Sequence, residues 1–290
     1  MARPLTRVIE KYSKYLMITP AVVTYTVFLV VPLAMLVLLS LNTGSKAVFD
    51  PSEITLKNYI DVLSDPRFYR IAADTFGMAL LTSAVTLGIA YPVAYFLAFK
   101  VKSVRVQSIV LFLLLAMYWV DWSVRSLAWL PILGDKGLVN QILISLGIIS
   151  EPMRLLFSRL ALLIIWVQTN MLFMIFPIHL ALTRIDPELI STAKALGASD
   201  WKAFWHITFK LSLPGVVVGL VFVFVSTLGD YATPSLWAGG LHMLGLTVHS
   251  YASFFMWPLA ATYATLMLII SLIILSLILR ISNIKRIFYE

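Results

Sequence analysis

Three ionisable side chains lie within or at the edge of long apolar stretches and are the residues most able to do chemistry: Asp121, Arg125 and Asp230. A charged side chain at the centre of a bilayer costs roughly 2.5–3.5 kcal/mol on insertion scales, so such a residue usually serves a function. Aromatic side chains accompany them in the sequence, namely Tyr118, Trp119, Trp122, Tyr231 and Trp237. Carboxylates and aromatic faces together can hold a cation. The pattern therefore predicts a path for a cationic solute, formed by Asp121, Trp119, Trp122, Arg125, Asp230 and Tyr231.

Each of these residues also has a purely structural interpretation. Asp121 and Arg125 are four residues apart, so on a continuous helix they share a face and can pair with each other. Asp230 can instead cap the turn that leads into Thr233 and Pro234. The aromatic residues can form the belt that marks a membrane–water interface. Since Arg125 can neutralise Asp121, the sequence ranks Asp230 as the carboxylate more available to a solute.

A polar segment at about 184–210 separates two apolar stretches and is a second candidate for function. Asp186 can cap a helix, and Pro187 suits the first helical position. Gly197 follows where a left-handed residue commonly ends a helix. Ser199 can then begin a second helix. The predicted helix, sharp turn and second helix form a rigid lever, which a loop that merely joined two spans would not need.

Six apolar segments are long enough to cross a bilayer as helices. We place them at about 17–41, 76–99, 107–131, 160–183, 211–233 and 258–281. The N-terminus, the loops after the second and fourth segments and the C-terminus carry 14 Lys and Arg, whereas the opposite loops carry six. The positive-inside rule then predicts that both termini and the loop at 184–210 are cytoplasmic.

The two longer segments on the opposite side, 42–75 and 132–158, carry shorter helical patterns. Apolar residues at Ile60, Leu63 and Phe68 predict a surface helix in the first of them. No soluble domain, internal repeat or low-complexity linker interrupts the chain. Residues 1–290 are therefore expected to form a single transmembrane domain.

The composition excludes several classes of protein. Hydrophobic residues make up 60% of the chain and charged residues 12%, against about a quarter charged in soluble domains. There is no cysteine, and the four histidines are scattered without metal-ligand spacing, so we expect no metal site. No phosphate-binding Gly-x-x-x-x-Gly-Lys-Ser/Thr loop, catalytic triad or paired carboxylates occur, so an enzyme is not expected. The basic residues lie between apolar runs, and this pattern indicates a membrane rather than nucleic acid as their partner.

The polar loop resembles the signature of binding-protein-dependent ABC importer permeases. That pattern is Glu-Ala-Ala, three residues, Gly, nine residues and Ile-x-Leu-Pro. Here Ser191-Thr192-Ala193 hold the first three places, Gly197 follows at the family's distance, and Ile207 comes after nine more residues. Ser191 replaces the acidic residue, and Phe209-Lys210 hold the Leu-Pro places, with Leu213-Pro214 shortly after. The glycine-centred shape is retained, while the contact made by the family's Glu is in question.

Other segments are similar to the spermidine/putrescine-type branch of these permeases. They run from Trp119 to Arg125, from Gly137 to Asn140 and from Gly229 to Leu236. The resemblance implies an all-α integral membrane protein with six transmembrane helices, a type I-like importer permease fold and a cytoplasmic coupling helix. It implies an inner (plasma) membrane location and import of a small, polyamine-like solute.

The resemblance also implies partners and their contacts. The first helix of the loop would dock on a separate ATPase through Glu188, Ser191, Thr192, Ala193, Leu196, Gly197 and Ala198. Two ATPase subunits would bind ATP and Mg, so this chain itself would need no cofactor. A second permease, expected to be a different chain with a homodimer as the alternative, and an external solute-binding protein would complete the importer.

Three other functions remain open from the sequence. A permease of this kind could carry another small solute. A secondary transporter would need its own coupling-ion site and inverted repeats, and the halves of this chain show no duplication. A membrane scaffold or intramembrane enzyme would be favoured by a catalytic dyad at membrane depth, and none is evident in the sequence.

Overall fold

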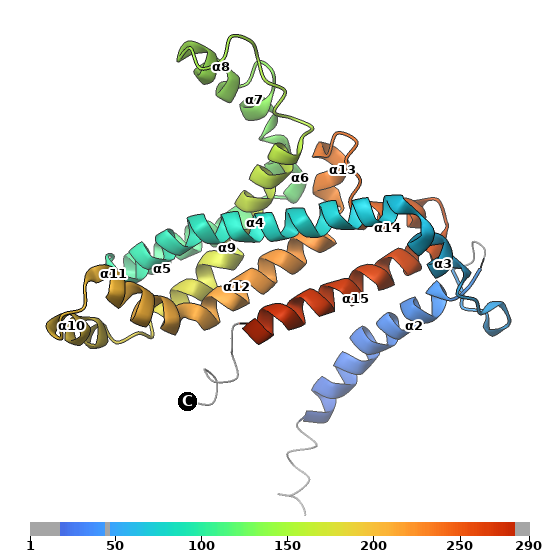
Figure 1. Cartoon of the computed structure of the whole chain (residues 1–290), viewed down its shortest axis with the longest axis horizontal. Helices are drawn as coiled ribbons and strands as arrows, with labels where there is room; N and C mark the ends of the chain where they lie inside the picture. The colour runs from blue at the N-terminus through green and yellow to red at the C-terminus, as the bar shows by residue number, and fades with distance from the viewer. Residues whose placement is uncertain (1–17, 44–46, 282–290) are drawn as a thin grey trace, which may run out of the picture. The chain divides into compact units, whose positions relative to one another are not determined.

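The computed structural model describes residues 18–43 and 47–281, and within these ranges the regular structure is entirely helical (Figure 1). The chain divides into two compact units. One unit comprises the residues up to Pro66 together with Thr247–Leu266. The other comprises Arg67–Leu246 and the residues from Met267 onward. The prediction of an all-α membrane protein is confirmed.

The first unit contains the N-terminal span, a helical stretch over Ile18–Ser40 that has no buried residues along its most apolar window. Its helices are η1 Thr26–Val30, α2 Val31–Ser40, η2 Pro51–Glu53, α3 Lys57–Ser64, most of α14 Leu244–Ser253 and the start of α15 Trp257–Ile281. Hydrogen bonds hold the Ser40 end of the span. The Ser40 hydroxyl lies 2.5 Å from the Tyr59 hydroxyl, and the Asn58 amide donates to the Asn42 carbonyl over 2.8 Å. The surface helix predicted from Ile60, Leu63 and Phe68 is present as α3, with Ile60 and Leu63 exposed. Phe68 was wrongly included, because it belongs to the next helix, α4 Pro66–Phe99, and is buried.

The second unit contains the remaining helices. In chain order they are α4 Pro66–Phe99, α5 Val104–Ala116, η3 Met117–Trp119, α6 Trp122–Leu127, α7 Leu130–Leu133, α8 Leu138–Ser145, α9 Arg159–Leu182, α10 Pro187–Ala195, α11 Asp200–Ala203, η4 Phe204–Thr208, α12 Phe209–Gly229 and α13 Ala232–Trp237. Helices α6 to α8 lie on one side of α4 in Figure 1, with α6 nearest to it and α8 farthest away.

Helices α9 and α12 approach each other closely because α12 presents glycines to its neighbour. A Cβ atom on Gly215 would lie 2.3 Å from the Pro177 carbonyl oxygen, and one on Gly219 would lie 2.6 Å from the Met174 sulfur. Small residues at such contacts let membrane helices pack backbone to backbone. This contact fixes the two helices that carry the polar loop between them.

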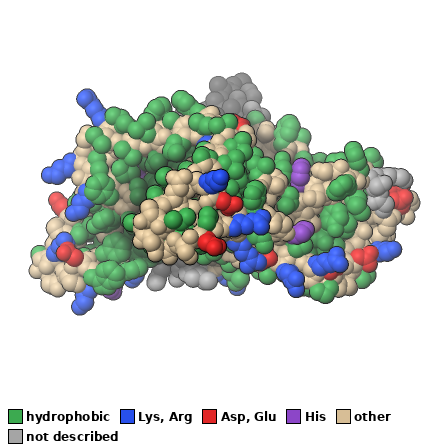
Figure 2. Space-filling model, turned by 90° about the horizontal axis from the view of Figure 1, so that it is seen from above, with side chains coloured by type: hydrophobic (Ala, Val, Ile, Leu, Met, Phe, Trp, Pro, Cys, Tyr) green, Lys and Arg blue, Asp and Glu red, His purple; other side chains and the backbone are tan. Residues whose placement is uncertain are grey.

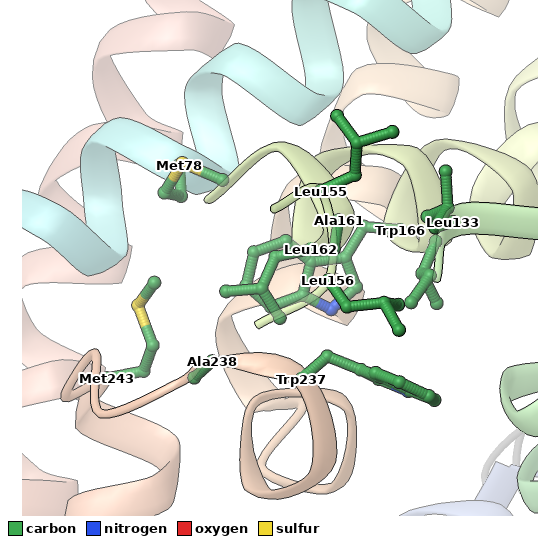
Figure 3. Close-up of a cluster of buried hydrophobic side chains, with 11 residues drawn as sticks. Met78, Leu133, Leu155, Leu156, Ala161, Leu162, Trp166, Trp237, Ala238 and Met243 are labelled. Atoms are coloured by element: carbon green, nitrogen blue, oxygen red, sulfur yellow. The ribbon is translucent and has the colours of Figure 1, made fainter. Parts of the chain in front are cut away.

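Two clusters of buried apolar side chains hold the helices of this unit together. The cluster near the start of α9 includes Leu162 and Trp166, and it extends to Trp237 of α13 and to Met243 (Figure 3). The cluster near the end of α9 contains Ile178 and pairs it with residues of α4 and α12. Helix α13 is thus packed against the start of α9, far along that helix from the polar loop.

The third predicted span is not one helix. Instead of a continuous 107–131, the chain forms Val104–Trp119 and Trp122–Ser145, which are bent by 98°. Val120 is extended at the break, and the Asp121 side chain caps the helix that follows. Among the described residues, five other helices are long and apolar enough to span a membrane, so the total there is six when the bent pair counts as one span.

The fifth predicted span, 211–233, also ends earlier than expected. Helix α12 stops at Gly229, and Asp230 is extended before α13 begins. Asp230 therefore lies in a turn between two helices rather than within a span.

Much of the surface is apolar, as lipid contact requires. Hydrophobic side chains are spread over the face shown in Figure 2, with charged side chains in separate groups. Leu113 and Phe222, for example, are 58% and 54% exposed.

Candidate functional site

The loop helix α10 begins as its sequence predicts. The Asp186 carboxylate accepts a hydrogen bond of 2.9 Å from the Glu188 backbone N–H, and Pro187 occupies the first helical position. Such a cap satisfies an N–H group that has no partner within the helix. The helix therefore starts at a defined residue.

The end of α10 is equally well defined. Gly197 has a φ of +90°, which side chains with a Cβ rarely adopt. The Ala198 N–H donates to the Ala193 carbonyl over 3.0 Å, and the Gly197 N–H donates to the Lys194 carbonyl over 2.9 Å. This pair of bonds is the Schellman arrangement. No other heavy atom lies within 4 Å of a Cβ built on Gly197, so the backbone conformation, not lack of space, demands glycine.

The turn after α10 is tied to the next helix. The Ser199 hydroxyl accepts from the Lys202 N–H over 3.3 Å and so caps α11, as predicted. Lys194 forms an ion pair with Asp200 at 2.5 Å. The hydrogen bond and the charge of Asp200 raise the pKa of Lys194. Both side chains are exposed, so the pair contributes little stability and mainly fixes the angle between the helices.

The outer face of α10 carries apolar side chains that the described chain leaves uncovered. None of the residues of α10 is buried, and Leu189 and Leu196 are 50% and 84% exposed. The Ser191 hydroxyl donates to the Glu188 carbonyl of its own helix over 2.9 Å. The predicted coupling residues Glu188, Ser191, Thr192, Ala193, Leu196, Gly197 and Ala198 therefore share one short helix and its terminal turn. Such a surface can dock into a complementary groove on another protein.

Aromatic contacts at the start of the helices that follow stiffen this loop. Trp201 stacks on Phe204, with ring centroids 6.3 Å apart, and Trp205 meets Phe209 edge to face at 4.8 Å. These rings connect α11 to the start of α12. A displacement of the loop would thus be passed to a membrane helix.

In the broken span, Asp121 and Arg125 have different partners. The Asp121 carboxylate accepts a bond of 2.8 Å from the Ser123 N–H and a second bond from its hydroxyl. The Arg125 guanidinium lies 4.9 Å over the ring of Tyr118. Its Nε atom is buried and has no hydrogen-bond partner among the described residues. Asp121 and Trp119 are exposed, Trp119 by 75%.

Asp230 is held by four donors. One carboxylate oxygen accepts from the Ala232 and Thr233 N–H groups at 2.9 and 3.0 Å, which caps α13. The other accepts from the Trp166 indole at 2.8 Å and from the Thr233 hydroxyl. A carboxylate so fully bonded can position helices, so the geometry favours the structural interpretation of Asp230.

Two tryptophans connect the segment around Asp121 with the segment around Asp230, which together carry the predicted path. The Trp122 indole donates to the Thr233 hydroxyl over 3.4 Å, and the Trp237 indole donates to the Ser126 hydroxyl. Helix α6 is thereby joined to α13, and Tyr231 lies exposed just before α13. The sequence missed Thr233 and Ser126 as the acceptors of these two indoles, and Trp166 as a donor to Asp230. The signal that could have revealed these bonds is a tryptophan within an apolar span, because a buried indole N–H needs a hydrogen-bond acceptor.

The arrangement is suited to positioning and binding rather than to bond chemistry. In residues 18–43 and 47–281 no cluster of His, Asp or Glu side chains is arranged to hold a metal ion. Exposed polar and aromatic side chains at a break in a membrane helix can instead contact a solute.

Comparison with known proteins agrees with the geometry. Residues 2–286 match the model of the family described as binding-protein-dependent transport system inner membrane component. The spermidine/putrescine transport system permease protein PotB of Escherichia coli (strain K12) is 30% identical over 262 residues, covering 89% of this chain and 94% of that protein. The polygalacturonan/rhamnogalacturonan transport system permease protein YteP of Bacillus subtilis (strain 168) is 27% identical, covering 79% of this chain and 71% of that protein.

A solved structure shares the fold. It is a chain of the bacterial alginate ABC transporter in complex with an alginate pentasaccharide-bound periplasmic protein, with a TM-score of 0.73 and 16% identity, and the match covers 97% of each chain. The family match spans nearly the whole sequence and includes the capped loop helix. This chain therefore belongs to the binding-protein-dependent transport system inner membrane components, the membrane-spanning permease subunits of ABC importers.

Proposed function

We propose that this chain forms part of the membrane path of an ABC importer for a small, polyamine-like cation, which an external binding protein delivers. The observation that carries the choice of solute is the 30% identity to a spermidine/putrescine permease over most of the chain. Family membership argues against the secondary transporter, the scaffold and the intramembrane enzyme that the sequence left open.

The loop helix α10 is proposed as the element that couples uptake to ATP. Two separate ATPase subunits would bind ATP and Mg. One of them would receive α10 in a groove. The exposed apolar Leu189 and Leu196 supply the contact area, and the caps at Asp186 and Gly197 make the helix rigid. Energetic coupling needs a rigid element with two discrete positions, which such a helix can provide.

The path for the solute is proposed to pass the break at Asp121. Irregular backbone at membrane depth is tolerated where it is buried in protein or lines a water-filled cavity. Asp121, Trp119 and Tyr231 are exposed beside this break or beside α13, so they can meet a cation. Trp122 and Arg125 support the break, and Asp230 holds α13 in place.

The remaining assembly follows from the same proposal. A second permease, expected to be a different chain, would complete the path, and the importer would lie in the inner membrane with both termini cytoplasmic. The termini themselves lie outside the described residues. The uncovered span at Ile18–Ser40 supports contact with lipid or with that second permease, because an apolar helix must be covered by one of them.

The neighbours named for alginate and for polygalacturonan/rhamnogalacturonan transport make acidic oligosaccharides the competing class of solute. Arg125, whose Nε is unpartnered among the described residues, is the observation that favours an anion. The importer, reconstituted in proteoliposomes with its ATPase, second permease and binding protein, should take up radiolabelled spermidine, and putrescine should compete. Uptake of an acidic oligosaccharide without uptake of either polyamine would contradict the proposed solute and favour the competing class.

A further inference from the structure

A groove between α4 and α9 combines a charge pair with apolar walls. Its cavity volume is about 480 Å³, and it lies between Asp74, Gly77 and Leu81 of α4 and Arg159, Leu160 and Leu163 of α9. All of these residues belong to the second unit. A Cβ built on Gly77 would have no other heavy atom within 4 Å, so the glycine leaves the floor of the groove open.

The charge pair has unused bonding capacity. One Arg159 nitrogen donates to one Asp74 oxygen over 2.7 Å, and the two side chains are 58% and 23% exposed. A guanidinium carries five N–H donors and a carboxylate has two acceptor oxygens. A single bond between them therefore leaves each able to bind a further group of opposite charge.

The pair lies at the level where a bilayer has its polar head groups. Arg159 is the first residue of the 24-residue helix α9, whose other end leads into the loop of α10. Twenty-four residues span about 36 Å, somewhat more than the roughly 30 Å of hydrocarbon in a bilayer. Arg159 is thus at the interface opposite α10, and Leu81 and Leu163 lie deeper along their helices.

The chemistry of the groove matches an amphipathic ligand with both charges in its head group. A phosphate can accept from the free donors of Arg159, and a primary ammonium can donate to Asp74. The apolar side chains below, Leu81 and Leu160, are 46% and 47% exposed and can contact an acyl chain. By contrast, the groove between α5, α9 and α12 is lined only by apolar residues and selects no head group.

Other occupants fit less well. Free phosphate gains nothing from the apolar walls and is repelled by Asp74. A helix of a second permease would remove the ion pair from water, which costs more than such a pair usually returns. We propose that this groove binds an aminophospholipid of the phosphatidylethanolamine type, with its phosphate on Arg159, its ammonium on Asp74 and an acyl chain over Gly77 and Leu81.

The test is thermal unfolding of the full-length chain, purified in detergent and titrated with short-chain phosphatidylethanolamine. The lipid should raise the unfolding temperature of the wild type. In Arg159→Gln the half-maximal lipid concentration should rise about tenfold, the usual effect of one lost charge-assisted hydrogen bond. Gly77→Leu should weaken binding similarly by filling the groove, while leaving the ion pair intact.

Three controls decide the result. Arg154→Gln removes an exposed arginine that does not line the groove and should bind like the wild type. Phosphatidylcholine, whose ammonium has no N–H, should stabilise the protein less than phosphatidylethanolamine. An equal effect of the two lipids, an equal effect of inorganic phosphate, or unchanged lipid binding in both Arg159→Gln and Gly77→Leu would overturn the proposal.

Discussion

Asp121 and Asp230 show how two carboxylates in one apolar chain take different roles. Asp230 accepts four hydrogen bonds from three residues, whereas Asp121 caps a short helix and stays exposed. Removing a half-buried acceptor leaves its donors unsatisfied, which is costly. Substitution of Asp230 should thus damage the structure, whereas Asp121→Asn, which keeps the cap, should change only the local charge.

Asp230→Asn should destabilise the protein by about 1–3 kcal/mol, because an amide offers one acceptor oxygen to donors that now share two. Thermal unfolding in detergent and the amount of protein in the membrane should both show the loss. Wild-type stability in Asp230→Asn would refute the structural role.

Asp121→Asn should leave the fold intact, since asparagine caps helices about as well as aspartate. Loss of the charge should weaken attraction of a cationic solute and lower uptake of spermidine at limiting concentration by about threefold to tenfold. Glu151→Gln, a second exposed carboxylate on the same side of the proposed topology, serves as the matched control. Equal uptake by Asp121→Asn and the wild type would remove Asp121 from the path.

At the level of elements, helix α10 was predictable from local signals in the sequence. The break before α6 was not predicted. The cap at Asp186 and the left-handed Gly197 both follow from residues within one or two turns. The break before α6 is also marked locally, by the bonds from Ser123 to Asp121, but the apolar length of the stretch favoured a continuous span. The Trp166–Asp230 bond joins residues 64 apart, which no local pattern encodes.

Gly197→Val should strain the turn by about 1–3 kcal/mol, because a β-branched residue disfavours a positive φ. ATPase activity should then lose its stimulation by solute-loaded binding protein, and uptake should fall, while the protein still inserts in the membrane. Gly197→Asn is the control, since asparagine tolerates the left-handed conformation. Normal coupling in Gly197→Val would show that the rigid turn does not carry the coupling.

For the whole molecule, hydrophobic length and basic residues were enough to predict an all-helical protein with about six spans. The sequence did not predict that the fifth span ends at Gly229. Where that span ends depends on which helices pack together, and packing is decided by side chains distant in sequence. Orientation stays a prediction that rests on the basic residues alone.

The orientation can be measured with single cysteines because the chain contains none of its own. A cysteine in place of the exposed Ser191 should react with a membrane-impermeant thiol reagent only after the cells are opened. A cysteine in place of the exposed Glu151 should react in intact cells. Labelling of Ser191→Cys from outside would invert the proposed topology.

The most direct test of the central claim is the energy source for uptake through this chain. In proteoliposomes that contain the chain with its partner subunits and binding protein, uptake of spermidine should require ATP on the side of α10. It should persist when ionophores collapse the ion gradients and should stop when the ATPase subunits are omitted. Uptake that needs an ion gradient and proceeds without ATP would contradict the assignment as the path of an ATP-driven importer.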